Sequence, residues 1–266
     1  MADFHVLAGS DQKLHFPAVR RIGFSDLTAA LAEGWRDFWA KPSHLVFLGV
    51  IYPLVGGALG LWTSGANAWP MLYPLLSGFA LLGPLAALPL YEMSRRQELG
   101  LETTWRSAFG VLTSPAIPSI AAIGLMLLVI FTIWLGLAQY LYESTFGIGS
   151  PASLAEFLNE VLGTPEGMTL MIWGNAAGLI LAVIVLATSL ISIPLLLDRD
   201  VGAAVAVQTS VRAVLRNPAT TAAWGLIVLG LLVLGSLPLL VGLAVVVPVL
   251  GHATWHLYRR LVQPEA

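Results

Sequence analysis

Three histidines are the side chains in this sequence best suited to chemistry. His252 and His256 are four residues apart, a spacing that places both imidazoles on one face of a helix. His44 begins another apolar stretch at the same expected depth. Imidazole nitrogens bind haem iron and divalent metals, so these three residues are the candidate haem or metal ligands. The simpler interpretation is that all three are polar anchors at the lipid headgroup boundary, beside Trp255 and Tyr258.

Other catalytic and cofactor-binding chemistries lack the residues they need. The sequence contains no cysteine, which excludes thiolate catalysis, disulfides, iron–sulfur clusters and cysteine-ligated zinc. It also has no Gly-rich phosphate loop, no nucleophile elbow and no pair of carboxylates expected to meet in a pocket. We therefore expect a protein that is not an enzyme and that works without a cofactor.

The elements that position these residues are apolar helices. Hydrophobic residues make up 57% of the chain and charged residues only 11%, where a soluble domain has about a quarter charged. Six stretches free of Asp, Glu, Lys and Arg are long enough to cross a bilayer core of about 30 Å, and a tight hairpin at residues 235–238 joins the last two. We predict an all-α membrane protein, a bundle of six transmembrane helices. The predicted spans are Leu45–Trp62, Pro70–Tyr91, Ala116–Ala138, Leu170–Leu197, Ala219–Leu237 and Pro238–Tyr258.

The distribution of cations predicts the orientation of these spans. All 13 lysines and arginines lie in segments that a six-span topology with an inside N-terminus places in the cytoplasm. The longest opposite loop, residues 139–169, carries four glutamates and a short amphipathic segment that Ser153 would cap. We expect a bacterial inner-membrane protein with both termini in the cytoplasm. The net charge of −2 gives no general basic field for nucleic acid.

Three amphipathic segments before the odd-numbered spans suggest an internal repeat. They are Leu27–Pro42, Leu101–Pro115 and Val201–Pro218, each ending at a proline. We predict that these segments are helices in the headgroup plane, and that in the first of them Leu27, Leu31, Gly34, Trp35 and Phe38 share one face. The predicted organisation is a cytoplasmic tail over residues 1–24 and one membrane domain over 25–262, built from parallel repeat units of about 25–96, 97–200 and 201–262.

Charged and aromatic residues at the cytoplasmic ends of the helices are candidates for contact with lipid or a partner. The cluster that includes Glu92 is expected to be a solvated ion-pair patch facing lipid, with partner docking as the second interpretation. The candidate contact residues are Trp35, Arg36, Glu92, Arg95, Arg96, Arg259 and Arg260.

A transport path would need polar groups or broken helices near the middle of the membrane. No Asp, Glu, Lys or Arg lies inside the spans, which excludes proton coupling through a buried carboxylate. The polar candidates are Asn175 and Ser189, and prolines such as Pro84 and Pro248 are expected to kink their helices. The alternative is that polar groups of this kind bond back to their own helix or to a neighbouring one.

Two sequence motifs resemble one bacterial family. They are PLYEMSRRQELG at residues 89–100, shortly after Gly83-Pro84, and GHATWHLYRR at residues 251–260. Over residues 25–262 the chain is similar to the integral membrane proteins grouped as domain of unknown function 2189, some of which carry the label cytochrome c oxidase. Three membrane histidines and no cysteine are too few ligands for an oxidase core.

These observations favour a non-catalytic accessory, scaffold or assembly protein, with a respiratory cytochrome oxidase complex as a candidate partner. The alternative is a channel or transporter for a small or lipid-like substrate. The expected partners are the lipid bilayer, another membrane complex or a second copy of the chain.

Overall fold

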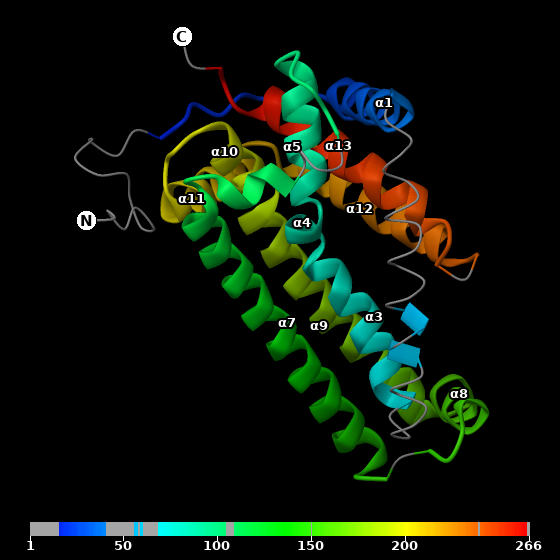
Figure 1. Ribbon diagram of the computed structural model, residues 1–266. Helices are drawn as coiled ribbons and strands as arrows, with labels where there is room; N and C mark the ends of the chain where they lie inside the picture. The colour runs from blue at the N-terminus through cyan, green and yellow to red at the C-terminus, as the bar shows by residue number, and fades with distance from the viewer. Residues whose placement is uncertain are drawn as a thin grey trace. The chain divides into compact units, whose positions relative to one another are not determined.

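The structure is a computed structural model that describes residues 16–40, 56–57, 59–60, 69–104, 109–149, 151–238 and 240–264. Within these ranges the chain is helical apart from turns, connecting segments and a single β-bridge between Val19 and Val262, which confirms the predicted all-α class. The elements drawn in Figure 1 are α1 (Phe24–Ala40), η1 (Trp69–Met71), α3 (Leu72–Leu81), α4 (Gly83–Ala86), α5 (Leu88–Glu98), η2 (Phe109–Thr113), α7 (Ile117–Phe146), α8 (Leu154–Gly163), α9 (Pro165–Ser189), α10 (Ser192–Asp198), α11 (Ala203–Arg216), α12 (Pro218–Ser236) and α13 (Leu243–Leu261).

Three segments of the described chain are long and apolar enough to cross a membrane. They are Ile117–Phe146, Pro165–Asp198 and Pro218–Ser236, of 30, 34 and 19 residues. They correspond to the predicted spans Ala116–Ala138, Leu170–Leu197 and Ala219–Leu237. α7 continues eight residues beyond its predicted end because Gln139–Phe146 supplies helix-compatible polar residues that bond to one another, such as the Gln139 amide to Glu143 at 2.6 Å.

The predicted span Pro70–Tyr91 is not one helix. It is divided among η1, α3, α4 and the start of α5, with breaks at Leu82 and Ala87. Pro84 and Pro89 follow these breaks, and each lacks the N–H group that would continue the helical hydrogen bonds. None of the resulting pieces is long enough to count as a membrane-crossing helix.

The remaining two predicted spans also differ from the structure or lie outside it. Leu45–Trp62 falls mostly outside the described residues. The last helix begins at Leu243, and the connection before it, residues 237–242, is longer than the predicted hairpin. In this turn the backbone at Gly242 comes close to the backbone at Gly235. A side chain would prevent this, since a Cβ on Gly242 would lie 2.7 Å from the Gly235 carbonyl oxygen. The six-span count is therefore not confirmed.

Two of the three segments predicted to be interfacial helices are helical in the structure, and their place at a membrane interface stays a prediction. α1 and α11 cover most of Leu27–Pro42 and Val201–Pro218, and the predicted outer-loop helix is α8, whose cap Ser153 accepts a hydrogen bond from the Glu156 N–H at 3.2 Å. The segment Leu101–Pro115 differs: residues 101–104 are not helical, and the 3-10 helix η2 follows beyond 105–108, which lie outside the described residues. The Thr103 hydroxyl donates to the Leu101 carbonyl and so competes with helical bonding.

The chain divides into two compact units. Unit 1 comprises residues 1–52, 84–125 and 186–266, and unit 2 comprises residues 53–83 and 126–185. In unit 2 the buried Trp134 of α7 is central: its indole N–H donates to the Pro74 carbonyl of α3 at 2.8 Å, and Gly78 and Gly178 leave room for its ring. The predicted repeat units remain a prediction.

In unit 1, α1 packs against α13 and α13 packs against α5. Glycines allow the helices of both pairs to come close together. A Cβ on Gly34 would lie 2.5 Å from the Ala253 backbone nitrogen, and one on Gly251 would lie 2.5 Å from Leu90 Cδ1. The buried residues of α1 are Leu27, Ala30, Gly34, Asp37 and Phe38.

The buried face of α1 is therefore rotated from the predicted one. Trp35 is 47% exposed, although the apolar pattern placed it on one face with Leu27, Gly34 and Phe38, which are buried. Asp37, which is not among the residues of that predicted face, is only 7% exposed. The close contact of Gly34 with α13 turns α1 so that its tryptophans point outward.

We predict that Gly34→Ala destabilises the protein although alanine is the better helix former. A Cβ in this contact costs about 1–3 kcal/mol through overpacking, which exceeds the gain of about 0.5–1 kcal/mol from helix propensity. Thermal unfolding in detergent should show a lower Tm. Gly136→Ala is the matched control, because nothing lies within 4 Å of its added Cβ; an unchanged Tm for Gly34→Ala would contradict the described α1–α13 contact.

Candidate functional site

A buried carboxylate, that of Asp37, lies where α1, α5 and α13 meet. Its Oδ2 accepts hydrogen bonds from Ser94 Oγ at 2.6 Å and His256 Nε2 at 2.8 Å, and its Oδ1 accepts one from Gln97 Nε2 at 3.0 Å. Ser94 and Gln97 belong to α5, and His256 belongs to α13. These donors satisfy a charge that could not otherwise be buried. We call Asp37, Ser94, Gln97, His252 and His256 the Asp37 cluster.

The direction of the Ser94 hydrogen bond determines which ring nitrogen of His252 carries a hydrogen. Ser94 Oγ also lies 2.7 Å from His252 Nδ1, and Ser94 and His252 are 1% and 3% exposed. A hydroxyl carries one proton, and Ser94 donates it to Asp37, so His252 Nδ1 is the donor in the second bond. The order of these groups, acid to hydroxyl to imidazole, differs from a catalytic triad, in which the imidazole lies between the acid and the hydroxyl.

An ion pair adjoins the Asp37 cluster on its α1 side. Arg260 forms two parallel hydrogen bonds with Glu33, from Nη1 to Oε2 at 2.7 Å and from Nη2 to Oε1 at 2.9 Å. His256 Nδ1 lies 3.4 Å from Glu33 Oε2. His256 therefore faces one carboxylate with each ring nitrogen. Bidentate pairs of this kind fix geometry as well as charge.

A second ion-pair group ties α13 to α5 and α10. Arg259 lies 2.9 Å from Glu98 Oε1 and 3.2 Å from Asp198 Oδ2. The Trp255 indole N–H donates to Glu98 at 3.0 Å, and the Tyr258 hydroxyl donates to Asp198. Each carboxylate here has a cation and a neutral donor, so the charges of this group at the end of α13 are paired within the chain.

Two of the three acids of α1, Glu33 and Asp37, are held in their charged form. Burial alone would raise the pKa of Asp37, but the hydrogen bonds from His256 and Ser94 and the nearby imidazoles hold that pKa below its ordinary value. The hydrogen bond from Arg260, followed by its charge, likewise lowers the pKa of Glu33 despite burial. The same pairing raises the pKa of Arg260. These groups stabilise the fold as ions.

The comparison with known families concerns the middle of the chain. Residues 71–198 match the family described as "Predicted integral membrane protein (DUF2189)". Over these residues the chain is similar to that family. None of the curated proteins and none of the solved structures compared with the chain matches it. The family segment includes the motif at residues 89–100, whereas the motif at 251–260 lies outside it.

The family segment therefore supplies only part of the Asp37 cluster. Ser94 and Gln97, both on α5, lie inside the matched residues. Asp37 and the two histidines lie outside them, on α1 and α13. The cluster thus joins the family segment to the parts of the chain that flank it.

The structure does not assemble the three candidate histidines as one described ligand set. His44 lies outside the described residues. His252 bonds to Ser94 and His256 bonds to Asp37, so each imidazole is a partner in a hydrogen-bonded network. In the described part of the chain, no three His, Asp or Glu side chains are arranged to hold a metal ion. The haem alternative stays a prediction.

The residues predicted to contact lipid or a partner differ from one another in burial and in their ion pairs. Glu92 is 6% exposed and therefore not in a solvated patch, while Arg95 and Arg96 lie 3.1 and 3.7 Å from it. Arg259 and Arg260 belong to the ion pairs described above. Trp35 and Arg36 remain at the surface of α1, where Arg36 lies 3.6 Å from Glu33.

The two candidate transport residues have partners within the protein. In unit 2 the Asn175 carbonyl accepts from the Tyr73 hydroxyl at 2.8 Å, and its amide donates to the Met171 carbonyl at 2.7 Å. Ser189, in unit 1, is 1% exposed. Asn175 thus bonds to its own helix and to a neighbouring one, as the alternative interpretation expected. A transport path stays a prediction.

The sequence patterns do not single out Asp37, Ser94 or Gln97 as site residues. A usable signal exists for Asp37, which follows Gly34 by three residues and Leu27 by ten, so it lies on their helix face. A carboxylate on a buried face requires donors from neighbouring elements. Which elements supply them depends on contacts between distant parts of the chain: Ser94 is 57, Gln97 60 and His256 219 residues from Asp37.

We predict that the protein loses stability in acid because the carboxylates of Glu33 and Asp37 become protonated. Their lowered pKa values mean that the stabilisation is complete above the ordinary carboxylate pKa of about 4 and is lost as pH falls through the lower folded-state values. The Tm in detergent should therefore fall between about pH 5 and pH 3.

Asp37→Asn should lower the Tm at pH 7 and reduce this pH dependence. Loss of a buried charged partner costs about 1–3 kcal/mol. Asp200→Asn is the matched control, since Asp200 is exposed. Equal effects of the two substitutions would refute the role of the Asp37 cluster.

Proposed function

We propose that the protein is a non-catalytic accessory or scaffold protein of the membrane, in which α1, α5 and α13 form a rigid platform. The observation that carries the proposal is the internal pairing of the polar cluster. The four carboxylates of Glu33, Asp37, Glu98 and Asp198 each accept a hydrogen bond from, or face a cation of, another element of the chain. Catalytic acids and bases must face a substrate, whereas these groups face one another. The proposal includes function without haem, so the purified protein should be colourless.

The platform presents an exposed aromatic face that suits a partner. Trp35 and Trp39 of α1 are 47% and 58% exposed, and their rings lie 5.7 Å apart in an edge arrangement. Trp35 also stacks on Phe38 at 5.7 Å. Arg36 lies between the two tryptophans in the sequence. Tryptophan and arginine dominate the binding energy of protein interfaces, so we assign this face to docking on another membrane complex.

The proposed setting is a bacterial inner membrane, crossed six times by three parallel units with both termini in the cytoplasm. The distribution of the 13 cations supports this orientation. The label cytochrome oxidase carried by some similar proteins makes a respiratory complex the first partner to examine.

The orientation can be tested with introduced cysteines, because the chain has none. Ile148→Cys in the outer loop should react with a membrane-impermeant maleimide in intact spheroplasts, and Ser25→Cys should react only after permeabilisation. Both positions are exposed, so their reactivity reports the side of the membrane. The reverse pattern would refute the proposed topology.

The docking role can be tested by co-purification in mild detergent. The tagged protein should migrate with a larger membrane complex on native gels, and Trp39→Ala should weaken that association by about 2 kcal/mol, or thirtyfold in affinity. Trp173→Ala is the matched control, since Trp173 is exposed to a similar extent on α9. Purification as a lone protein in several mild detergents would count against the proposal, as would equal effects of the two variants.

A further inference from the structure

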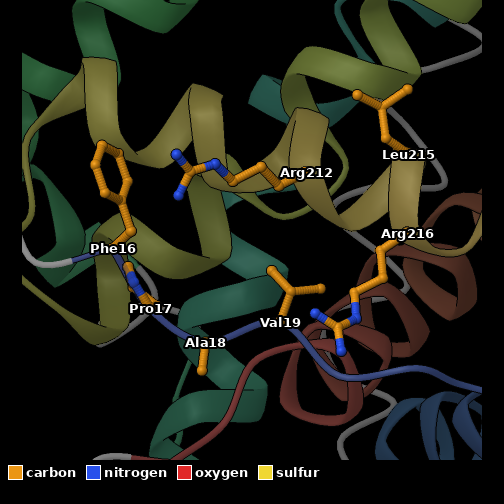
Figure 2. A pocket seen from close by; sticks show the side chains of 7 residues that line it. All are labelled: Phe16, Pro17, Ala18, Val19, Arg212, Leu215 and Arg216. Atoms are coloured by element: carbon orange, nitrogen blue, oxygen red, sulfur yellow. The ribbon is translucent and has the colours of Figure 1, made fainter.

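A second cationic feature of unit 1 lies away from the Asp37 cluster. A hollow of about 500 Å³ lies between α11 and the segment before α1, and its walls are Phe16, Pro17, Ala18, Val19, Arg212, Leu215 and Arg216. Figure 2 shows the Arg212 side chain extending toward the Phe16 ring, while Arg216 reaches toward Val19. No acidic residue belongs to this lining. We call it the Arg212 pocket.

The segment that supplies the wall of residues 16–19 is anchored by hydrogen bonds at Ala18, Arg20 and Ile22. Asn217, at the end of α11, accepts from the Ile22 N–H at 2.9 Å and donates to the Arg20 carbonyl at 3.0 Å. On the other side, the Gln263 N–H donates to the Ala18 carbonyl at 2.9 Å. The pocket is therefore formed before a ligand arrives, which reduces the cost of ordering it on binding.

The two arginines of the pocket are available to an anion. The Arg212 guanidinium carbon lies 4.1 Å from the centre of the Phe16 ring, a cation–π contact that orients the group without neutralising its charge. Among the described residues, Arg212 and Arg216 form no ion pair, in contrast to the paired arginines of α13. Guanidinium groups are suited to phosphate because they offer several N–H donors in one plane.

The position of the pocket along the chain places it at the membrane surface. α12, which is long and apolar enough to cross a membrane, begins at Pro218, two residues after Arg216. The arginines therefore precede the entry of the chain into the bilayer by about one or two helical turns. Between them in the sequence, Leu215 is 73% exposed, an apolar side chain suited to the acyl boundary.

We propose that the Arg212 pocket binds the phosphate of an anionic phospholipid headgroup. Arg212 and Arg216 donate to the phosphate oxygens, Phe16 holds Arg212 in position, and Leu215 contacts the acyl chains. A free phosphate ion shares the charged group of this ligand but lacks the acyl chains that Leu215 would meet.

The test is native mass spectrometry of the full-length protein released from detergent containing phosphatidylglycerol or phosphatidylcholine. Phosphatidylglycerol adducts should predominate. Arg212→Gln and Arg216→Gln should each weaken phosphatidylglycerol binding about fivefold, since an arginine near an anionic surface contributes about that factor. Arg21→Gln is the matched control: Arg21 is exposed and lies outside the pocket lining, so its effect should be less than twofold.

A folding control and a competition experiment make the result decisive. The Tm of each variant should equal that of the unchanged protein, because Arg212 and Arg216 are exposed. Equal loss of binding in Arg21→Gln would overturn the site in favour of diffuse surface charge. Equal binding of both lipids would overturn it as well. Displacement of phosphatidylglycerol by millimolar inorganic phosphate would assign the pocket to a free ion and overturn the lipid proposal.

Discussion

The need of the Asp37 carboxylate for hydrogen-bond donors determines how the helices of unit 1 meet. A carboxylate that is 7% exposed is stable only where donors surround it. α1 itself provides none of those found here: Ser94 and Gln97 come from α5 and His256 comes from α13. Apolar contacts alone would allow these helices to slide or rotate, because such contacts are not directional. The hydrogen bonds of one acid select a single register among the three helices.

The close approach at Gly34 and the polar cluster depend on each other. Without a side chain at Gly34, the backbones of α1 and α13 come close enough for Asp37 to reach His256. The bidentate pair between Glu33 and Arg260 holds the same two helices one turn further along. Glu33 and Asp37 are used in this way, whereas Trp35, Arg36 and Trp39 lie on the exposed side of α1.

Local properties of the sequence predict much of the fold. The lengths of the charge-free stretches predict α7, the segment of α9 and α10, and α12, because a bilayer imposes a minimum length. Ser153 predicts the start of α8, since its cap involves neighbouring residues. The division of Pro70–Tyr91 was open to prediction only in part: proline shows where a helix can break, but the packing of the pieces decides whether it does. The Asp37 cluster depends on partners far along the chain, which helical periodicity does not identify.

The β-bridge between Val19 and Val262, together with the pair Glu33–Arg260, has a consequence for synthesis of the protein. Glu33 and Arg260 are 227 residues apart, and a ribosome adding about 5–20 residues per second needs about 10–45 s to make that interval. During this time α1 has left the ribosome while the donors of α13 do not yet exist. Until then Asp37 can be paired only with Ser94 and Gln97 of α5, so α1, the first of the three helices to be made, completes its contacts only after the last one has been made.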